Sequence, residues 1–162
     1  MGHKILHVMM AEKFMPSFID VINNHFSREK HKMVVINIAN IECPSSLQEQ
    51  NNLIWITKKH QLLKLSYLLN TSNKIILHGL FLKSLIHTLF FQPWLLKKCY
   101  WVMWGGDFYL PNNQRWFKKR VIKRIRNFVT YIKGDFELVK KWYGAEGEHH
   151  ECFMYPSNIY KE

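Results

Sequence analysis

The sequence is poor in acidic residues. Its 162 residues include 23 lysines and arginines but only 12 aspartates and glutamates, which gives a formal net charge of +11. Residues 134–162 hold six of the acids, so residues 1–133 carry 20 basic residues against six acidic ones. Such a balance predicts attraction to an anionic partner, which can be nucleic acid, a nucleotide or a lipid surface.

Cysteines and long apolar segments are also scarce. Cys43, Cys99 and Cys152 are odd in number and far apart, which argues against a secreted disulfide framework and favours a reducing cytoplasm. The longest apolar region, Ile75 to Leu96, is interrupted by polar residues and by Pro93, so it is a poor candidate for a membrane span. The chain shows no signal-peptide pattern. We expect a soluble or peripheral protein.

Two common phosphate-binding fingerprints are missing. Neither Gly-x-Gly-x-x-Gly nor Gly-x-x-x-x-Gly-Lys occurs, and we find no internal repeat or low-complexity linker. Hydrophobic residues make up 48% of the chain and aromatic residues 15%, which excludes a disordered protein. The length fits a single domain, residues 1–162, with a substantial hydrophobic core.

Apolar runs that are typical of strands alternate with helical patterns along the whole chain. The expected strands are Lys4–Met10, Lys32–Ile38, Asn52–Thr57, Lys74–Leu77, Tyr100–Trp104, Phe128–Ile132 and Glu151–Tyr155. The expected helices are Pro16–Phe26, His60–Asn70, Leu80–Phe91, Asn113–Asn127 and Gly134–Trp142, with one helical turn in the polar connection Asn40–Asn52. This alternation predicts an α/β fold, a parallel sheet with helices on both faces.

One stretch combines an apolar run with two glycines and an acid. Tyr100–Trp104 leads directly into Gly105, Gly106 and Asp107. Asp107 would stand at the carboxyl end of a central strand, where open α/β sheets bind their ligands. The alternative is an ordinary turn in which Asp107 caps the next helix.

A residue capable of acid–base chemistry also follows the preceding expected strand. His78 and Gly79 follow it directly. If the two strands are neighbours, the imidazole of His78 and the carboxylate of Asp107 converge on one edge of the sheet, where they can serve as general base, orienter or partners of sugar hydroxyls. The alternative is that His78 is hydrogen-bonded within the core and that Asp107 is a simple helix cap.

A basic helix is the clearest electrostatic feature. Seven basic residues and no acid lie between residues 115 and 126, and they are Arg115, Lys118, Lys119, Arg120, Lys123, Arg124 and Arg126. On a helical wheel the apolar residues Phe117, Val121, Ile122 and Ile125 share one side. Three interpretations remain open for the basic side: a solvated face, a patch for anionic lipid or phosphate, and a nucleic-acid groove.

Two further segments have competing interpretations. Leu80–Trp94 is apolar nearly all round, which indicates either a buried helix or an apolar patch that enters a bilayer interface through Phe90, Phe91 and Trp94. Glu148–Cys152 has a metal-like composition, but its spacing is wrong for a common zinc site, so we interpret it as structural or solvated.

Taken together, these segments resemble a bacterial enzyme family. The order of the blocks is similar to that in the TDP-Fuc4NAc:lipid II Fuc4NAc transferases, glycosyltransferase family 56, which act in the assembly of enterobacterial common antigen. The basic helix lies between the second and third of these blocks. The blocks that carry the resemblance are His78–Phe81, Tyr100–Tyr109 and Gly134–Phe136.

The resemblance implies a GT-B architecture, which is two Rossmann-like domains with the active site between them. This chain would be the amino-terminal, acceptor-side half, without the nucleotide-sugar domain. The implied reaction moves a 4-acetamido-4,6-dideoxyhexose from a dTDP-sugar to an undecaprenyl-diphosphate-linked saccharide. It would take place at the cytoplasmic side of the inner membrane, with the enzyme held peripherally by anionic lipid. No cofactor or metal is implied.

The resemblance also assigns roles to individual residues. Asp107 and His78 are the candidates for catalysis or acceptor binding. The substrate-binding candidates are Gly79, Trp104, Gly105, Gly106 and Asp135. The candidates for membrane or phosphate contact are Arg115, Lys119, Arg120, Lys123 and Arg124. The alternatives are a basic α/β nucleic-acid-binding module without catalysis, and a GT-B glycosyltransferase with a different donor.

Overall fold

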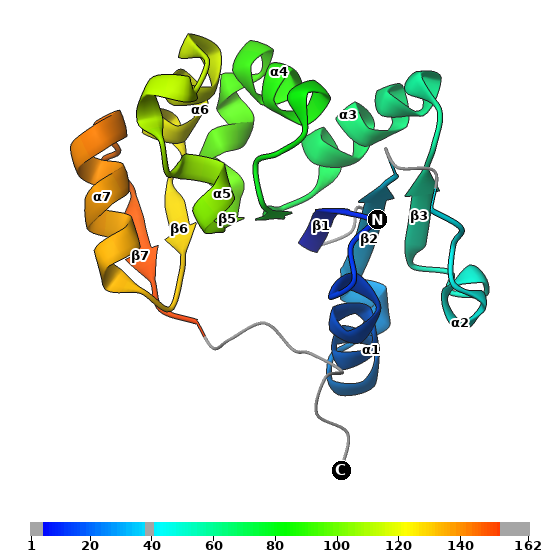
Figure 1. Ribbon diagram of the computed structural model, residues 1–162. Helices are drawn as coiled ribbons and strands as arrows, with labels where there is room; N and C mark the ends of the chain where they lie inside the picture. Colours follow the sequence, from blue (N-terminus) through cyan, green and yellow to red (C-terminus); the bar gives the residue numbers. More distant parts are fainter. Residues whose placement is uncertain (1–4, 38–40, 153–162) are drawn as a thin grey trace. The chain divides into compact units, whose positions relative to one another are not determined.

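The computed structural model describes residues 5–37 and 41–152 (Figure 1). Their contacts group into two compact units, one comprising the residues up to Ile75 and the other beginning at Ile76. We describe each unit by itself. The prediction of one domain over residues 1–162 remains a prediction.

The first unit is built on three parallel strands, β1 (Ile5–Met10), β2 (His31–Ile36) and β3 (Leu53–Ile56), in the order β3-β2-β1. The register places Val35 beside Met9 on one side and beside Trp55 on the other. Four successive residues of β1, from Leu6 to Met9, are buried. Because successive side chains point to opposite faces of a strand, both faces of β1 are covered.

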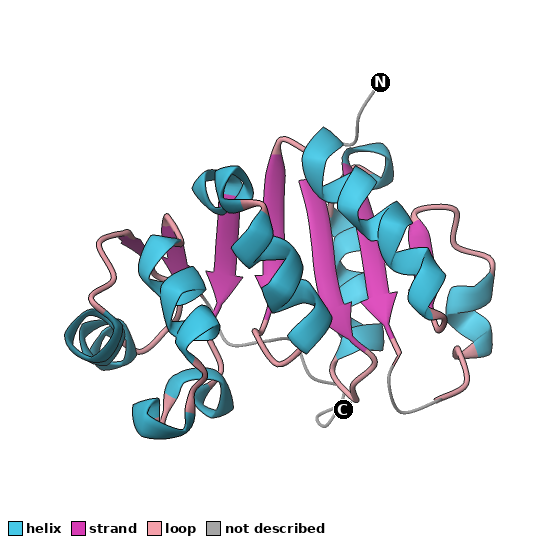
Figure 2. Ribbon diagram, turned by 90° about the horizontal axis from the view of Figure 1, so that it is seen from above, coloured by secondary structure: helices cyan, strands magenta, loops and turns pink. Residues whose placement is uncertain are grey.

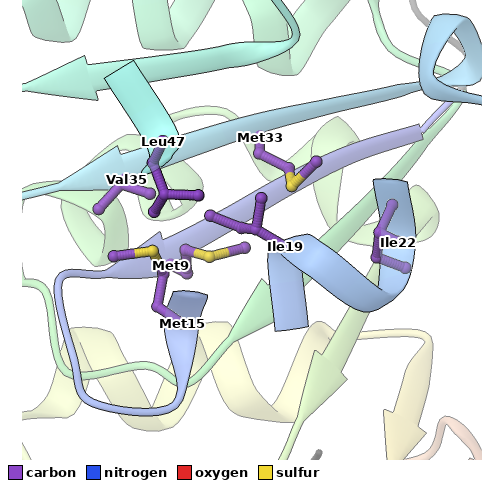
Figure 3. Close-up of a cluster of buried hydrophobic side chains, with 7 residues drawn as sticks. All are labelled: Met9, Met15, Ile19, Ile22, Met33, Val35 and Leu47. Carbon is purple, nitrogen blue, oxygen red and sulfur yellow. The ribbon is translucent and has the colours of Figure 1, made fainter. Parts of the chain in front are cut away.

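Helices α1 (Met15–His25), α2 (Ser45–Gln48) and α3 (Leu62–Thr71) connect and cover these strands. Pro16 lies in the first turn of α1, where its missing N–H costs no helical hydrogen bond. Short 3₁₀ turns at Arg28–Lys30 (η1) and Lys59–Gln61 (η2) complete the unit. Figure 3 shows the hydrophobic cluster between α1, α2 and the strands, which consists of Met9, Met15, Ile19, Ile22, Met33, Val35 and Leu47.

The second unit has the strand order β4-β5-β6-β7, also parallel. These strands are β4 (Lys74–His78), whose last three residues belong to this unit, β5 (Cys99–Val102), β6 (Asn127–Val129) and β7 (Glu148–His150). The helical segments between them are α4 (Lys83–Phe91), η3 (Pro93–Lys98), α5 (Gly105–Phe108), η4 (Pro111–Asn113), α6 (Trp116–Arg124) and α7 (Lys133–Tyr143). Figure 2 distinguishes the helices of the chain from its strands by colour.

Parallel strands alternating with helices confirm the predicted Rossmann-like α/β fold class. Many element boundaries differ from the prediction, and four of the differences have an identifiable cause. Strand β5 ends at Val102 instead of Trp104, and α4 begins at Lys83 instead of Leu80, because the Leu80 N–H bonds a side chain and Leu82 is extended.

Helix α6 begins at Trp116 instead of Asn113, because Pro111–Asn113 forms a separate 3₁₀ turn and Arg115 is extended. The last strand is Glu148–His150 and not Glu151–Tyr155, since the Glu148 N–H pairs with the Arg126 carbonyl. The expected positions Lys4, Ile38 and 153–155 lie outside the described residues.

Candidate functional site

Asp107 joins a loop and a strand of the second unit. It lies on the single turn of α5, directly after β5, and its side chain is fully buried. Oδ1 accepts the Leu80 N–H at 2.9 Å, and Oδ2 accepts the indole N–H of Trp101 at 3.1 Å. The carboxylate therefore ties the loop after β4 to the strand β5, which is a rigid-corner role and not the simple helix cap considered from the sequence.

Burial shifts the pKa of both predicted catalytic residues. It raises the pKa of Asp107 to about 6, although the Leu80 N–H and the Lys118 ammonium act in the opposite direction. Burial also lowers the pKa of His78 to about 3, which leaves a neutral imidazole at pH 7. Asp107 offers no free face to a substrate in this state, so direct base catalysis by it requires a rearrangement that exposes the carboxylate.

The structure fills the space beside three predicted substrate-binding glycines with side chains of the unit itself. Gly79 has φ +95°, and a Cβ there would lie 2.9 Å from the Phe81 ring and 3.3 Å from Asp107 Oδ2. A Cβ on Gly106 would also meet Phe81, at 3.2 Å, and one on Gly105 would lie 2.6 Å from the Tyr109 ring. These glycines make room for aromatic packing around Asp107.

Asp135 and Trp104 lie near the same loops. Asp135 is in the first turn of α7, largely buried, and its Oδ1 accepts the Tyr109 hydroxyl at 2.7 Å. The Trp104 carbonyl accepts the Asp107 N–H at 2.8 Å. All the predicted catalytic and substrate-binding residues thus gather around the carboxyl ends of β4, β5 and β6, the edge where parallel α/β sheets bind ligands.

The outer side of α6 forms a separate, cationic surface. Lys119, Arg120, Lys123 and Arg124 line a hollow of about 400 Å³ together with Trp116 and Tyr143. From residue 50 to residue 134 the sequence contains a single acid, Asp107, and Asp107 is buried. No exposed acidic residue between positions 50 and 134 therefore offsets the positive charge of this surface. Arg115 lies in a different pocket, beside Lys118.

Exposed aromatic side chains continue from Trp116, which lines this cationic surface, onto α4 and η3. Trp116 is 68% exposed, Phe91 74% and Trp94 59%. The Phe90 ring contacts the Phe91 ring at 5.3 Å and the Trp116 ring at 5.1 Å between centroids, so α4 and α6 share one aromatic cluster. We call the four cations and these four aromatic residues the amphipathic face. The buried-helix interpretation of Leu80–Trp94 holds for Leu85, Ile86 and Leu89 but not for its carboxyl end.

Lys118 is a site residue that sequence reasoning missed. It is only 8% exposed and lies on the inner side of α6. Its spacing from Val121, Ile122 and Ile125 is i, i+3, i+4 and i+7, which places it on the apolar stripe. That spacing was the available signal.

The Glu148–Cys152 segment makes structural contacts. Glu148 forms an ion pair with Arg126, and the His149 and His150 rings hydrogen-bond Thr130 and Asn127 of the neighbouring segment. Among the described residues, no group of three histidine, cysteine or acidic side chains is placed to hold a metal ion. In residues 5–37 and 41–152 there is also no helix with the length and apolarity that crossing a bilayer requires.

The fold and these surfaces define an α/β protein with a buried carboxylate at the sheet edge and an exposed amphipathic face. No protein-family model matches the chain, and no curated protein matches it either.

Proposed function

We propose that the chain is the acceptor-side domain of a glycosyltransferase that works at a membrane surface. It transfers a 4-acetamido-4,6-dideoxyhexose from a dTDP-sugar to an undecaprenyl-diphosphate-linked saccharide, at the cytoplasmic side of the inner membrane. A nucleotide-sugar domain is part of this proposal, and neither a metal nor a cofactor is required by it.

The observation that carries the proposal is the amphipathic face. Interfacial membrane proteins combine aromatic rings, which enter the headgroup region, with cations, which attract anionic lipid. Here Trp116 lines the same hollow as Lys119, Arg120, Lys123 and Arg124. Its ring contacts Phe90, which contacts the exposed ring of Phe91, and the exposed Trp94 follows α4 in η3. Each lysine or arginine near an anionic surface contributes about 1 kcal/mol, so four of them supply roughly 4 kcal/mol before aromatic insertion.

The glycosyl-transfer part of the proposal is supported by the resemblance and by where its residues lie. His78, Asp107 and Asp135 come from three separate segments of the sequence and lie at the ends of successive parallel strands, β4, β5 and β6. This edge is the usual place for a substrate in such folds. The amphipathic face belongs to the same unit, which is consistent with an acceptor that stays in the membrane.

Co-sedimentation of the purified chain with vesicles tests the membrane part. We expect binding to vesicles that contain phosphatidylglycerol, weaker binding to pure phosphatidylcholine, and loss of most binding in the variant with Lys119, Arg120, Lys123 and Arg124 all changed to Gln. A variant with Lys58→Gln and Lys64→Gln, two exposed lysines of the first unit, is the control and should bind normally. Equal binding to both vesicle types would contradict the proposal.

Incorporation of radiolabelled sugar tests the enzymatic part. The chain, alone and together with a separately supplied nucleotide-sugar domain, is incubated with the labelled dTDP-sugar and vesicles that carry the lipid-linked acceptor. Label in the lipid fraction supports glycosyl transfer. Vesicle binding without any transfer in either arm would leave membrane attachment standing and reject the enzymatic assignment.

A further inference from the structure

A small pocket lies between the start of α4 and the start of α6, apart from the amphipathic face. It has a volume of about 190 Å³. Three of its lining residues are basic, Lys83, Arg115 and Lys118, and Asn113 and Gln114 add amide groups. No acidic side chain lines it. The whole pocket belongs to the second unit.

Two helices present their first turns to this pocket. Helix α4 begins at Lys83 and helix α6 at Trp116, and each has nine residues. Neither has a hydrogen bond from a capping side chain, and neither has an acid in its first turn. The first N–H groups of a helix lack internal partners and carry partial positive charge, so these helix starts favour an anion.

Lys118 supplies the independent indication of a ligand. The residue is only 8% exposed, and it lines the pocket. Neither a hydrogen bond nor an ion pair joins its ammonium group to any residue in the part of the chain that the structure describes. The ammonium nitrogen is not among the fully enclosed side-chain atoms that lack a partner, so it is reached by solvent and can meet an anion in the pocket that Lys118 lines.

Asp107 does not fill this role. Burial lowers the pKa of the Lys118 ammonium, and the negative charge of Asp107 partly offsets this shift. Both Asp107 oxygens, however, are bonded to Leu80 and Trp101. The ammonium group therefore retains its hydrogen-bonding capacity for a ligand in the pocket.

We propose that this pocket binds a phosphate or diphosphate group, with Lys118 as its buried cation and Lys83 and Arg115 at its rim. A water molecule takes about 30 Å³ in the liquid, so the pocket has room for roughly six waters, which suits one or two phosphoryl groups. The site goes beyond the proposed function, because it needs neither membrane attachment nor glycosyl transfer. The phosphate can belong to a soluble diphosphate or to a lipid headgroup.

Calorimetric titration of the full chain with inorganic diphosphate tests the site without lipid or sugar. We expect Lys118→Gln to weaken binding by about tenfold or more, because charge-assisted hydrogen bonds are lost. Lys97→Gln removes an exposed lysine of the same unit and should change affinity less than about twofold. Binding that is absent in the wild type, or unchanged in Lys118→Gln, would overturn the proposal.

Two further arms separate the remaining outcomes. If Lys119→Gln with Lys123→Gln abolishes diphosphate binding while Lys118→Gln does not, the amphipathic face is the site and the proposal is wrong. Vesicles containing phosphatidic acid, used as competitors of diphosphate, distinguish a headgroup from a soluble source, and either source supports the site.

A measurement on the unmodified protein covers the case in which Lys118→Gln does not fold. Lysine acetylation followed by mass spectrometry should show at least about threefold protection of Lys118 by diphosphate, consistent with one bound charge-assisted partner. The exposed Lys141 serves as the internal reference. Equal protection of Lys118 and Lys141 would reject the site. A failure of diphosphate binding would reject this site without affecting the proposed membrane attachment. A failure of vesicle binding would reject that attachment without affecting this site.

Discussion

The carboxylate of Asp107 shows how a single residue type serves either chemistry or structure according to its surroundings. An acid after a buried strand and two glycines is typical of a ligand site, and the residues around it do meet at the sheet edge. Yet both of its oxygens accept hydrogen bonds from within the unit, and the side chain is fully buried. Its first contribution is therefore to hold the loop at Gly79–Leu80 against β5.

Gly79 is needed for that arrangement. With φ at +95° and an added Cβ at 2.9 Å from Phe81, we expect Gly79→Ala to lower the free energy of unfolding by about 1–2 kcal/mol. The matched control is Gly134→Ala in the first turn of α7, where the nearest atom is 3.9 Å away. It should leave stability unchanged or raise it by about 0.5–1 kcal/mol. Urea denaturation measures both, and equal effects would contradict the strained position of Gly79.

The raised pKa of Asp107 predicts a specific dependence of stability on pH. The group titrates near 6 in the folded protein and near 3.8 when unfolded, so the folded state binds its proton more tightly. Its contribution is therefore greatest below pH of about 4 and is lost as the pH rises through about 6, about 3 kcal/mol in all.

The difference in unfolding free energy between the wild type and Asp107→Asn isolates this contribution. We expect the free energy of unfolding of the wild type to fall relative to that of Asp107→Asn between pH 4 and pH 6.5. His78 acts in the opposite direction in both proteins, because its lowered pKa makes stability rise with pH, and it cancels in the comparison. Parallel pH profiles for the two proteins would show that Asp107 titrates normally.

Helix α6 shows, at the scale of an element, how one segment places its side chains in three different environments. Val121 and Ile122 face the core, four cations line the outer hollow, and Lys118 is enclosed beside the start of α4. The helical period of 3.6 residues assigns these positions. Trp116, at its first residue, continues the aromatic cluster of α4.

That aromatic cluster gives a prediction at the same scale. If the proposed membrane attachment is right, Phe91→Ser and Trp116→Ser each weaken binding to phosphatidylglycerol vesicles by about tenfold, because each removes an aromatic ring that inserts into the interface in that proposal. Stability should change by about 1 kcal/mol or less, since both rings are mostly exposed.

Leu63→Ser is the matched control for this prediction. Leu63 is 79% exposed on α3 of the first unit, so its removal should affect neither vesicle binding nor stability. Vesicle flotation and thermal unfolding provide the two measurements. A loss of binding in Leu63→Ser as large as that in Phe91→Ser would indicate unspecific adsorption of apolar residues.

Across the whole molecule, charge is distributed along the sequence in a way that favours one kind of partner. Residues 1–133 carry a balance of +14, from 20 basic and six acidic residues, while residues 134–162 carry six acids against three lysines. The aromatic residues of the amphipathic face cluster together instead of alternating with the cations. Stacking platforms for single-stranded nucleic acid alternate the two, so the distribution favours a lipid surface.

Salt dependence tests this molecular property. Raising NaCl from about 0.05 M to about 0.5 M shortens the screening length from roughly 14 Å to roughly 4 Å. We expect affinity for anionic vesicles to fall at least about tenfold, with the remainder due to the aromatic rings. A gel-shift assay run in parallel is the control. Tight, salt-sensitive binding to RNA or DNA without vesicle binding would favour the nucleic-acid-binding alternative.

Much of the fold was predictable because it depends on local patterns. Alternating apolar runs and helical periods predicted the α/β class, and Pro16, Pro93 and Gly79 marked where elements begin or end. Most errors lie at element ends, as at Leu80 and Asn113, and the last strand begins at Glu148 instead of the predicted Glu151. There, hydrogen bonds to distant residues or a separate 3₁₀ turn override the local preference.

The sequence by itself determined the chain's basic charge, the alternation of strands and helices, and the candidate residues around His78, Asp107 and the basic helix. Only the tertiary structure decided what surrounds each of them. Asp107 is enclosed because Leu80 and Trp101, from other segments, bond its two oxygens. Lys118 is largely buried because α4 packs beside α6, and the enclosed carboxylate of Asp107 acts on its ammonium group. Solvent exclusion arises from contacts between distant segments, and these contacts set the charge and accessibility of both side chains.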